Sequence, residues 1–416
     1  MIKEKLNILL VTQYFHPEPF FANTFLVKAL ISKGHSVEVL TSLPNYPNGK
    51  FYVGYKNGLP RKETIFDAVV HRVLTFPRGE NNISLAINYL VFAIFASIKA
   101  LTGSFKRPDI IFLTQFSPIY MALAAIALKK RFSVPLVYWV QDIWPESVIS
   151  TLNIRNKLIC KFLTSSSSIL YKKADFLLVQ NAAMINMIER FGIASELIDI
   201  LPNTVSSDYR PINPKKEFKY AHLFPLTGFK IMFAGNIGKA QGFDTLLKAA
   251  LKLSKIGIEV HWIIAGNGSD LKRLKFEVSR LELKHLFHFI GSHPQEEMSF
   301  YFAHADAMLV MLKKNKIFSM TVPCKLQGYF AAGKPVLGSI DGETARIIEE
   351  SGSGYASPAE DPESLVEIIK KMINDFIDKR TLYEKASLNY FKNNYSEEFV
   401  ARKLENILLK IVNLRN

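Results

Sequence analysis

Short apolar runs alternate with longer segments of helical periodicity along most of this chain. In the first half the runs that predict strands are residues 6–12, 36–41, 108–114, 135–140 and 175–180. Segments with apolar residues at helical spacing lie between them, at 24–33, 118–129, 157–173 and 182–191. Because strands and helices alternate, we predict an α/β fold with a parallel sheet covered by helices on both faces. Ligands of such sheets bind beyond the carboxyl ends of the strands.

The second half starts this pattern afresh. Apolar runs at 229–235, 260–266, 286–292 and 307–312 predict strands, and residues 360–377 and 397–414 predict helices. Residues 206–224 are polar and proline-containing, which is typical of a linker. Since 416 residues exceed what one hydrophobic core usually holds, we predict two domains joined by this linker.

Residues 321–343 predict a helix, a turn and a short buried strand. Pro323 fits the start of the helix, and Gly333 and Pro335 end it. Lys325 lies in the first turn, so helix N–H groups, the helix dipole and one ammonium group could bind a phosphate. The alternative is an ordinary helix–turn–strand with a solvated lysine.

A glycine-rich turn at 235–242 follows the first strand of the second half. Such a turn brings backbone N–H groups against an anion, and Lys239 could add a charge. The turn lacks the spacing of both the dinucleotide fingerprint and the NTPase phosphate loop.

In the first half, the loops at 13–23, 42–49 and 141–147 follow predicted strands. They carry His16 and two carboxylates, Asp142 and Glu146, at the edge where ligands bind. The alternatives are a solvated histidine and a helix-capping aspartate.

No charged residue occurs from Asn81 to Ile98, an apolar stretch at the lower limit for a membrane span. A span fits badly between strands of one sheet. Two interpretations remain: a helix packed in the domain, or one in the membrane interface with Lys99, Lys106 and Arg107 near the headgroups.

The formal net charge is +15, and the chain has only two cysteines, so a disulfide framework is excluded. No arginine-rich run or zinc-finger spacing accompanies the charge, which argues against a nucleic-acid partner. An anionic membrane surface or a phosphate-bearing substrate explains it equally well. The N-terminal apolar run is too short for a signal peptide, and we expect it to be a strand.

Several motifs together resemble the GT-B glycosyltransferases, and more narrowly the retaining enzymes of family 4 that include bacterial O-antigen and capsule fucosamine transferases. The motifs are QYFHPE at 13–18, LPNYPNG at 43–49, QDIWPES at 141–147, AGNIGKAQGFD at 234–244, AGNG at 265–268 and GKPV at 333–336. The resemblance implies two Rossmann-like parallel-sheet domains facing a central cleft. It places an acceptor-side domain at 1–205, the linker at 206–224, a nucleotide-sugar domain at 225–395 and, at 396–416, a helix returning to the first domain.

The resemblance also implies a nucleotide-sugar donor, UDP-linked, on the second domain. The residues implied to bind it are Gly235, Asn236, Gly238, Lys239, Gln241, Gly266, Asn267, Ile290, Ser319, Val322 and Gln327. Ser319 and Gln327 stand where many family members carry two glutamates, and Asn236 and Gln241 stand where an arginine and a lysine usually hold the diphosphate.

On the first domain the resemblance implies a polyprenyl-diphosphate-linked saccharide as acceptor, near His16, Asn23, Asn45 and Tyr46. Asp142, Glu146 and Lys325 are the expected catalytic residues, and Gln141 matches the family's histidine. No cofactor is expected. No Asp-x-Asp occurs, so no metal is expected either.

These expectations place the enzyme in the cytoplasm, peripherally on the inner face of the bacterial plasma membrane, where the donated sugar could be N-acetyl-L-fucosamine or a related amino sugar. Two alternatives stay open: a UDP-sugar 2-epimerase of the same fold, and a non-catalytic basic protein that binds membrane or nucleic acid.

Overall fold

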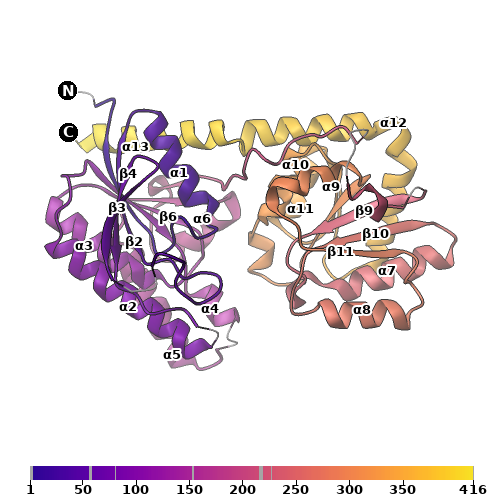
Figure 1. Ribbon diagram of the computed structural model, residues 1–416, viewed down its shortest axis with the longest axis horizontal. Coiled ribbons are helices and arrows are strands. Elements are labelled where there is room, and N and C mark those ends of the chain that lie inside the picture. The colour runs from indigo at the N-terminus through magenta and orange to yellow at the C-terminus, as the bar shows by residue number, and fades with distance from the viewer. Residues whose placement is uncertain are drawn as a thin grey trace. The chain divides into compact units, whose positions relative to one another are not determined.

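The computed structural model describes residues 3–55, 59–79, 81–151, 154–214, 219–225 and 227–415. The chain forms two compact units, each built on its own sheet. Unit 1 comprises Met1–Asn203 and Val400–Asn416, and unit 2 comprises Thr204–Phe399 (Figure 1).

Sheet A of unit 1 has eight strands in the order β3-β4-β2-β1-β5-β6-β7-β8. Their bounds are β1 Asn7–Val11, β2 Ser36–Ser42, β3 Arg61–Ile65, β4 Ala68–Val73, β5 Ile110–Gln115, β6 Leu136–Val140, β7 Phe176–Val179 and β8 Ile198–Ile200. The predicted parallel sheet is confirmed, except that the edge strand β3 pairs antiparallel with β4. Sequence reasoning missed this hairpin because β3, RKETI, is a charged edge strand without a buried face.

The helices of unit 1 are α1 Phe21–Ser32, α2 Asn82–Thr102, η1 Ile119–Met121, α3 Ala122–Phe132, α4 Glu146–Thr151, α5 Lys157–Tyr171, α6 Ala182–Glu189 and η2 Ser195–Leu197. Asparagine side chains begin three of them: Asn81 accepts from the N–H of Ser84, Asn156 from Leu158 and Ile159, and Asn181 from Met184.

Sheet B of unit 2 has six parallel strands in the order β11-β10-β9-β12-β13-β14. Their bounds are β9 Phe229–Ala234, β10 Val260–Ala265, β11 Phe287–Gly291, β12 Ala307–Met311, β13 Val336–Ser339 and β14 Gly354–Ser357. Alternate residues of β9 serve two cores, Ile231 and Phe233 on one face and Met232 and Ala234 on the other. A strand buried on both faces reads as a continuous apolar run, as its sequence does.

The helices of unit 2 are η3 Ala221–Leu223, η4 Lys239–Gln241, α7 Phe243–Lys255, α8 Leu271–Arg280, η5 Gln295–Glu297, α9 Met298–Ala303, η6 Phe318–Met320, α10 Cys324–Ala331, α11 Glu343–Ser351 and α12 Pro362–Asn394. The helix predicted at 360–377 is therefore too short at its end: α12 continues to Asn394, and its later turns bury Tyr383 and Ser387.

The described part of the predicted linker is packed rather than loose. Tyr209 stacks on Phe302 of α9 with ring centroids 5.8 Å apart, and the N–H of Arg210 donates to Ser299 Oγ at 2.9 Å. These contacts explain why residues from Thr204 onward belong to unit 2.

The last helix, α13 Glu397–Arg415, contributes residues from Val400 onward to unit 1. There Glu405 pairs with Lys33 Nζ at 2.7 Å and lies 3.2 Å from His35 Nε2, while Lys403 Nζ lies 3.4 Å from Asp199 Oδ1.

Candidate active site

The carboxyl edge of sheet B is opened by glycines. Gly235 and Gly266 directly follow β9 and β10 and have φ of 140° and 127°. A Cβ on Gly266 would lie 1.9 Å from the Gly235 carbonyl oxygen, and one on Gly268 would lie 2.3 Å from that of Ile237. The two loops therefore stack backbone on backbone, which only glycine permits here.

This stacking leaves donors without acceptors. The N–H of Gly235 donates to Ala265 and that of Ile237 to Asn267, at 3.0 and 2.8 Å. Within the described residues, the N–H groups of Asn236, between these two, and of Gly238, after them, have no acceptor. Alternating bonded and open amides at a strand end form a site suited to an anion.

Lys325, in the first turn of α10, lies against the glycine-rich turn at 235–242. Its Nζ donates to Gln241 Oε1 at 2.9 Å, sits 3.9 Å from the centre of the Phe233 ring, and would be 3.2 Å from a Cβ on Gly235. Burial lowers the pKa of Lys325 to about 7. The structure thus brings together the lysine and the glycine-rich turn that the sequence predicted separately.

Two further lysines lie close by. Lys239 and Lys313 both help to hold the pKa of Asp270 below its usual range, after the larger effect of its hydrogen bonds from Arg273. The N–H of Lys313 donates to the Ala240 carbonyl at 2.8 Å, which ties the β12–α10 loop to the glycine-rich turn. Lys313 was missed from the sequence, although it follows a predicted strand in a run of lysines.

Ser319 and Val322 lie in the segment between β12 and α10, and Gln327 lies on α10. Ser319 packs on Gly342, where a Cβ would meet its carbonyl oxygen at 2.1 Å, and Thr344 Oγ1 donates to the Thr321 carbonyl at 2.8 Å. The loop before α10 is thereby held against the start of α11. Gln327 is buried, and Ser319 and Val322 are half-buried.

Ile290 and Asn267 complete the donor-side prediction. Asn267 is exposed after β10, and Ile290 is half-buried at the end of β11. The carbonyl of Ile290 lies 2.7 Å from His293 Nε2, and His293 Nδ1 is 2.7 Å from the Tyr301 hydroxyl. All eleven donor-side residues predicted from the sequence lie on unit 2: Ile290 lies in β11, Gln327 lies on α10, and the others lie in the segments that follow β9, β10 and β12.

The carboxyl edge of sheet A is built from side chains instead. The buried Glu18 carboxylate accepts from the N–H groups of Phe15, Asn45 and Tyr46, at 3.2, 2.8 and 2.8 Å. Burial raises the pKa of Glu18 to about 7 despite these bonds. Asn45 is also buried, and its amide bonds to the Leu43 carbonyl, so both residues hold the loop.

Aromatic rings gather above that loop. Phe20 packs against Tyr14, Tyr46 and Phe116, with ring centroids 4.5, 5.0 and 5.1 Å apart. The Arg78 guanidinium lies 5.0 Å from the centre of the Tyr46 ring and donates to the Tyr14 hydroxyl at 3.2 Å. Phe20, Tyr46, Phe116 and Arg78 are half-buried, so a ligand can reach them.

Next to β6, Asp142 accepts from the N–H of Ser117 at 3.2 Å, and burial raises its pKa. Gln141 Oε1 accepts from Asn203 Nδ2 at 3.0 Å. The buried Nε2 of Gln141 has no acceptor among the described residues. Glu146 is the first residue of α4, which follows the loop that carries Gln141 and Asp142.

His16 and Asn23 have structural contacts. His16 packs against the Phe66 ring at 5.0 Å, and its carbonyl accepts from Arg72. Asn23 is fully buried and donates to Thr12 Oγ1 and the Tyr14 carbonyl, at 2.9 and 2.7 Å. Both fix the β1–α1 loop.

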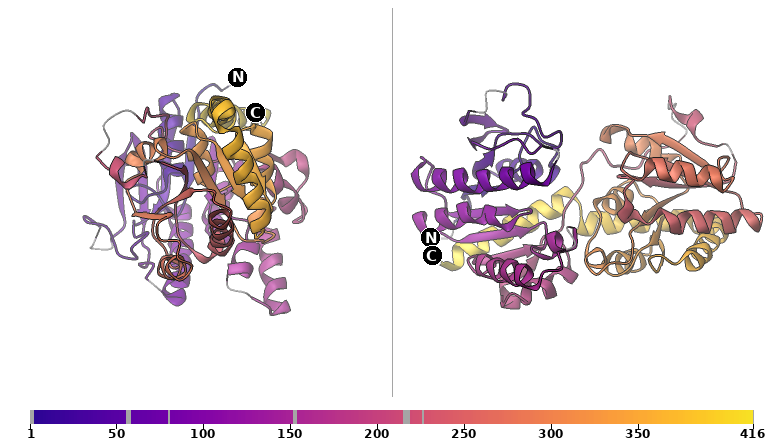
Figure 2. Two further views of the ribbon diagram at one scale, coloured as in Figure 1. Left: turned by 90° about the vertical axis from the view of Figure 1, so that its right-hand side faces the viewer. Right: turned by 90° about the horizontal axis from the view of Figure 1, so that it is seen from below.

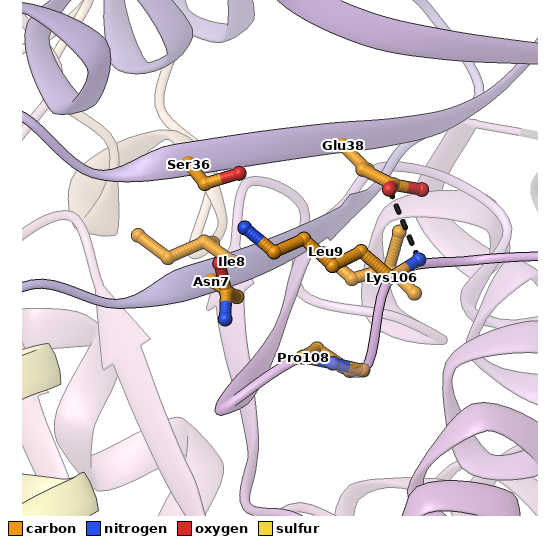
Figure 3. Close-up of a pocket in the computed structure, with 7 residues that line it drawn as sticks. All are labelled: Asn7, Ile8, Leu9, Ser36, Glu38, Lys106 and Pro108. Atoms are coloured by element: carbon orange, nitrogen blue, oxygen red, sulfur yellow. Dashed lines mark hydrogen bonds between the residues drawn. The ribbon is translucent and has the colours of Figure 1, made fainter.

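No group of three His, Cys, Asp or Glu side chains able to hold a metal ion occurs in the part of the chain that the structure describes. A cavity of about 10 Å³ lies at the opposite, amino edge of sheet A (Figure 3). Glu38 Oε1 accepts there from the N–H of Lys106 at 3.0 Å. This volume holds at most one water, so this cavity is too small to be a substrate site.

Two family models match the two halves of the chain. The model described as Glycosyltransferase Family 4 matches residues 24–209, and that described as Glycosyl transferases group 1 matches residues 214–388. The "Probable glycosyltransferase WbjE" of Pseudomonas aeruginosa is 26% identical over 304 residues, covering 71% of this chain and 74% of that protein.

Two further similarities extend over most of the molecule. WcaI of Escherichia coli K12, provisionally named as a colanic acid biosynthesis glycosyl transferase, is 21% identical over 315 residues, covering 74% of this chain and 76% of that protein. The crystal structure of Anabaena HepE in complex with UDP and glucose superposes with a TM-score of 0.69 at 15% identity, covering 97% of this chain and 99% of that one. The chain is a glycosyltransferase of the GT-B fold, with a family 4 domain in its first half and a group 1 domain in its second.

Proposed function

We propose that this enzyme transfers a sugar, with retention of configuration, from a UDP-sugar to a lipid-linked saccharide in bacterial O-antigen or capsule synthesis. The relative WcaI, named for colanic acid biosynthesis, supports a role in polysaccharide synthesis. N-acetyl-L-fucosamine and related amino sugars are the first donors to test.

One observation carries the proposal: the Lys325 ammonium contacts Gly235 and Gln241 of the glycine-rich turn, in which the N–H groups of Asn236 and Gly238 have no acceptor among the described residues. In the transfer, the bond from the sugar's anomeric carbon to the diphosphate oxygen breaks, and its electron pair leaves with the diphosphate. The acceptor hydroxyl oxygen bonds to the same carbon and loses its proton. Fixed N–H groups and a lysine aimed at the leaving diphosphate stabilise the developing negative charge.

UDP fits as the carrier because HepE, with the same fold, was crystallised with UDP and glucose. We propose that Lys325, Lys239 and Lys313 neutralise the diphosphate, so that no metal or other cofactor is required. We propose that Ser319 and Val322, in the segment before α10, and Gln327, on α10, contact the rest of the donor.

The acceptor belongs on unit 1 in this proposal. Half-buried Phe20, Tyr46 and Phe116 offer faces to a sugar ring, and Arg78 beside them offers a cation to a phosphate. The free Nε2 donor of Gln141 and the Asp142 carboxylate, at the end of β6, would orient the acceptor hydroxyl. A lipid-linked acceptor places the enzyme at the cytoplasmic face of the plasma membrane.

The test is a product assay with purified protein, a panel of UDP-sugars and a short-chain polyprenyl-diphosphate saccharide. We expect UDP release and a lengthened saccharide whose new linkage, read by NMR, keeps the donor's anomeric configuration. Conversion of the donor sugar without acceptor would instead identify a UDP-sugar 2-epimerase. Binding of no UDP-sugar at all in calorimetry would favour a non-catalytic protein, and inversion at the anomeric carbon would refute retention.

A further inference from the structure

Helix α2 carries its large apolar side chains on the outside. The residues that face the core are Asn88, Phe92, Ala96 and Ala100, which lie four apart, and Ala93 beside them. A series of exposed large apolar residues lies three or four apart and consists of Ile83, Ile87, Leu90, Ile94, Ile98 and Leu101, with Phe95 exposed next to Ile94. We call this second set the α2 stripe. A surface helix of a globular protein normally has the reverse arrangement.

The helix is fixed to unit 1 by its middle. Asn88 Oδ1 accepts from Gln13 Nε2 at 2.7 Å, and Asn88 Nδ2 donates to the Phe76 carbonyl at 2.5 Å. Residues Ile83–Thr102 are long and apolar enough to cross a membrane, yet only 28% of this window is buried. The hydrogen bonds of buried Asn88 hold one face of α2 against unit 1. The opposite face, which carries the α2 stripe, therefore points away from the domain.

The stripe borders a basic hollow. A cavity of about 380 Å³ lies between α2 and the β3–β4 hairpin, lined by Phe95, Ile98 and Lys99 of the helix and by Arg61 and Lys62 of β3. In the described part of the chain, no ion pair engages Lys62 or Lys99, whereas Arg61 donates to the Gly54 carbonyl at 2.5 Å. Two ammonium groups outside the ion pairs of the described residues therefore stand at the border of an apolar surface, although Lys62 is near enough to Glu38 to help lower the pKa of that carboxylate, after the larger effect of His71.

The neighbouring helices have the same character. α2 packs on α3, and both α2 and α5 contact η1, so the three helices lie on one side of unit 1 (Figure 2). None of the three contains Asp or Glu. Their basic residues are Lys99, Lys129, Lys130, Arg131, Lys157 and Lys161. On α5, Leu158, Ile159 and Phe162 are also exposed.

We infer that this side of unit 1 docks on an anionic phospholipid bilayer. The α2 stripe lies among the acyl chains near the headgroups, and the hollow takes a lipid phosphate between Lys62 and Lys99. An apolar stripe bordered by cations and free of acid suits such a surface. This inference rests on the proposed function only in that the lipid-linked acceptor would lie in the same bilayer.

The first experiment is sedimentation of the full-length protein with vesicles of phosphatidylglycerol and phosphatidylcholine. Leu90→Glu tests the stripe, and Leu382→Glu on α12 is its matched control, since the two leucines are 61% and 62% exposed. We expect Leu90→Glu to weaken vesicle binding about tenfold or more, and Leu382→Glu to leave it unchanged. Equal binding by both variants, or no binding by the wild type, would overturn the inference.

A second variant tests the hollow. Lys62→Gln combined with Lys99→Gln should weaken binding to the phosphatidylglycerol vesicles about tenfold and leave binding to pure phosphatidylcholine vesicles unchanged. Lys272→Gln combined with Lys284→Gln, two exposed lysines of unit 2, is the control. A loss shared equally by both pairs would show that only net charge acts and would overturn the headgroup site.

Calorimetric binding of UDP-glucose to the same preparations separates this inference from the proposed function. If the α2 and hollow variants lose vesicle binding but still bind UDP-glucose, a membrane surface separate from the donor site is confirmed. If the wild type binds vesicles but not UDP-glucose, only the proposed donor site is refuted. If Leu90→Glu changes the oligomeric state in light scattering while the wild type ignores vesicles, the stripe is a contact between copies and the inference fails.

Discussion

The carboxyl edges of the two sheets of this enzyme expose different kinds of chemical group. At the carboxyl edge of sheet B, Gly235, Gly266 and Gly268 bring backbone amides to the surface under Lys325. At the same edge of sheet A, the surface is made of rings and amide side chains, such as Tyr46, Phe116 and Gln141. In each sheet, the loops that follow the carboxyl ends of the parallel strands are where ligands bind.

The difference follows from what each edge is proposed to bind. A diphosphate needs concentrated, fixed positive charge, which open N–H groups and a lysine provide at short range. A saccharide offers ring faces and hydroxyls, which aromatic side chains and amides match. Glycines therefore mark the donor side, and larger polar and aromatic residues mark the acceptor side.

Among the tests of this difference between the two sheet edges, replacing Lys325 should have the largest effect. Lys325→Ala should lower turnover about 100- to 1,000-fold, because the leaving diphosphate loses its nearest fixed charge. Lys325→Met should also raise the free energy of unfolding by about 1–3 kcal/mol, since burial disfavours the ammonium in the free protein. Initial rates with saturating UDP-sugar and denaturant titrations measure the two effects.

Lys272→Ala, an exposed lysine on α8, is the control and should change neither quantity. Wild-type turnover in Lys325→Ala would remove the observation on which the proposed donor site depends.

The pH dependence of donor binding should be the next largest effect. With a pKa of about 7, Lys325 in the free protein is charged below that pH and neutral above it. A bound diphosphate favours the ammonium, so binding takes up a proton above pH 7, and affinity for UDP-glucose should fall by up to about tenfold per pH unit there. Calorimetry in two buffers of different ionisation enthalpy measures this uptake.

In Lys325→Ala the proton uptake should disappear. A wild-type affinity that is flat from pH 7 to 9, or that rises, would show that the ammonium does not contact the diphosphate.

The smallest expected effect is on the acceptor side. Tyr46→Ala removes a ring that packs on Phe20 and lies under Arg78, and should raise the acceptor KM about fivefold. The dissociation constant for UDP-glucose should stay unchanged, because Tyr46 belongs to unit 1. Steady-state kinetics with varied acceptor, together with donor calorimetry, provide both numbers. A weakened donor site with an unchanged acceptor KM would reverse the assignment of the two edges.

Much of the fold follows from local patterns. The buried strands of both sheets read as continuous apolar runs, and β9 shows why, since its alternate residues serve two cores. The helix at 324–331 begins next to Pro323 and ends before Gly333, where the sequence predicted it. The β3–β4 hairpin was missed because charges along β3 obscure its strand pattern.

The site was predicted unevenly for a similar reason. The glycines and Lys325 stand in local motifs, so they were found. Phe233, Lys313 and Arg78 lack such a motif, and their positions depend on contacts far along the chain, as between Lys313 and Ala240.

The sequence by itself determined the alternation of strands and helices and the glycine-rich turns, because propensity and periodicity act over a few residues. It also contained the charge-free helix at 81–98 but left its surroundings open. Only the tertiary structure decided which face of that helix is buried, because Asn88 and the alanines pack inward and leave the isoleucines outside. Likewise only the packing of α10 against β9 set Lys325 over Gly235, since burial and the pKa it causes depend on neighbours that are distant in the chain.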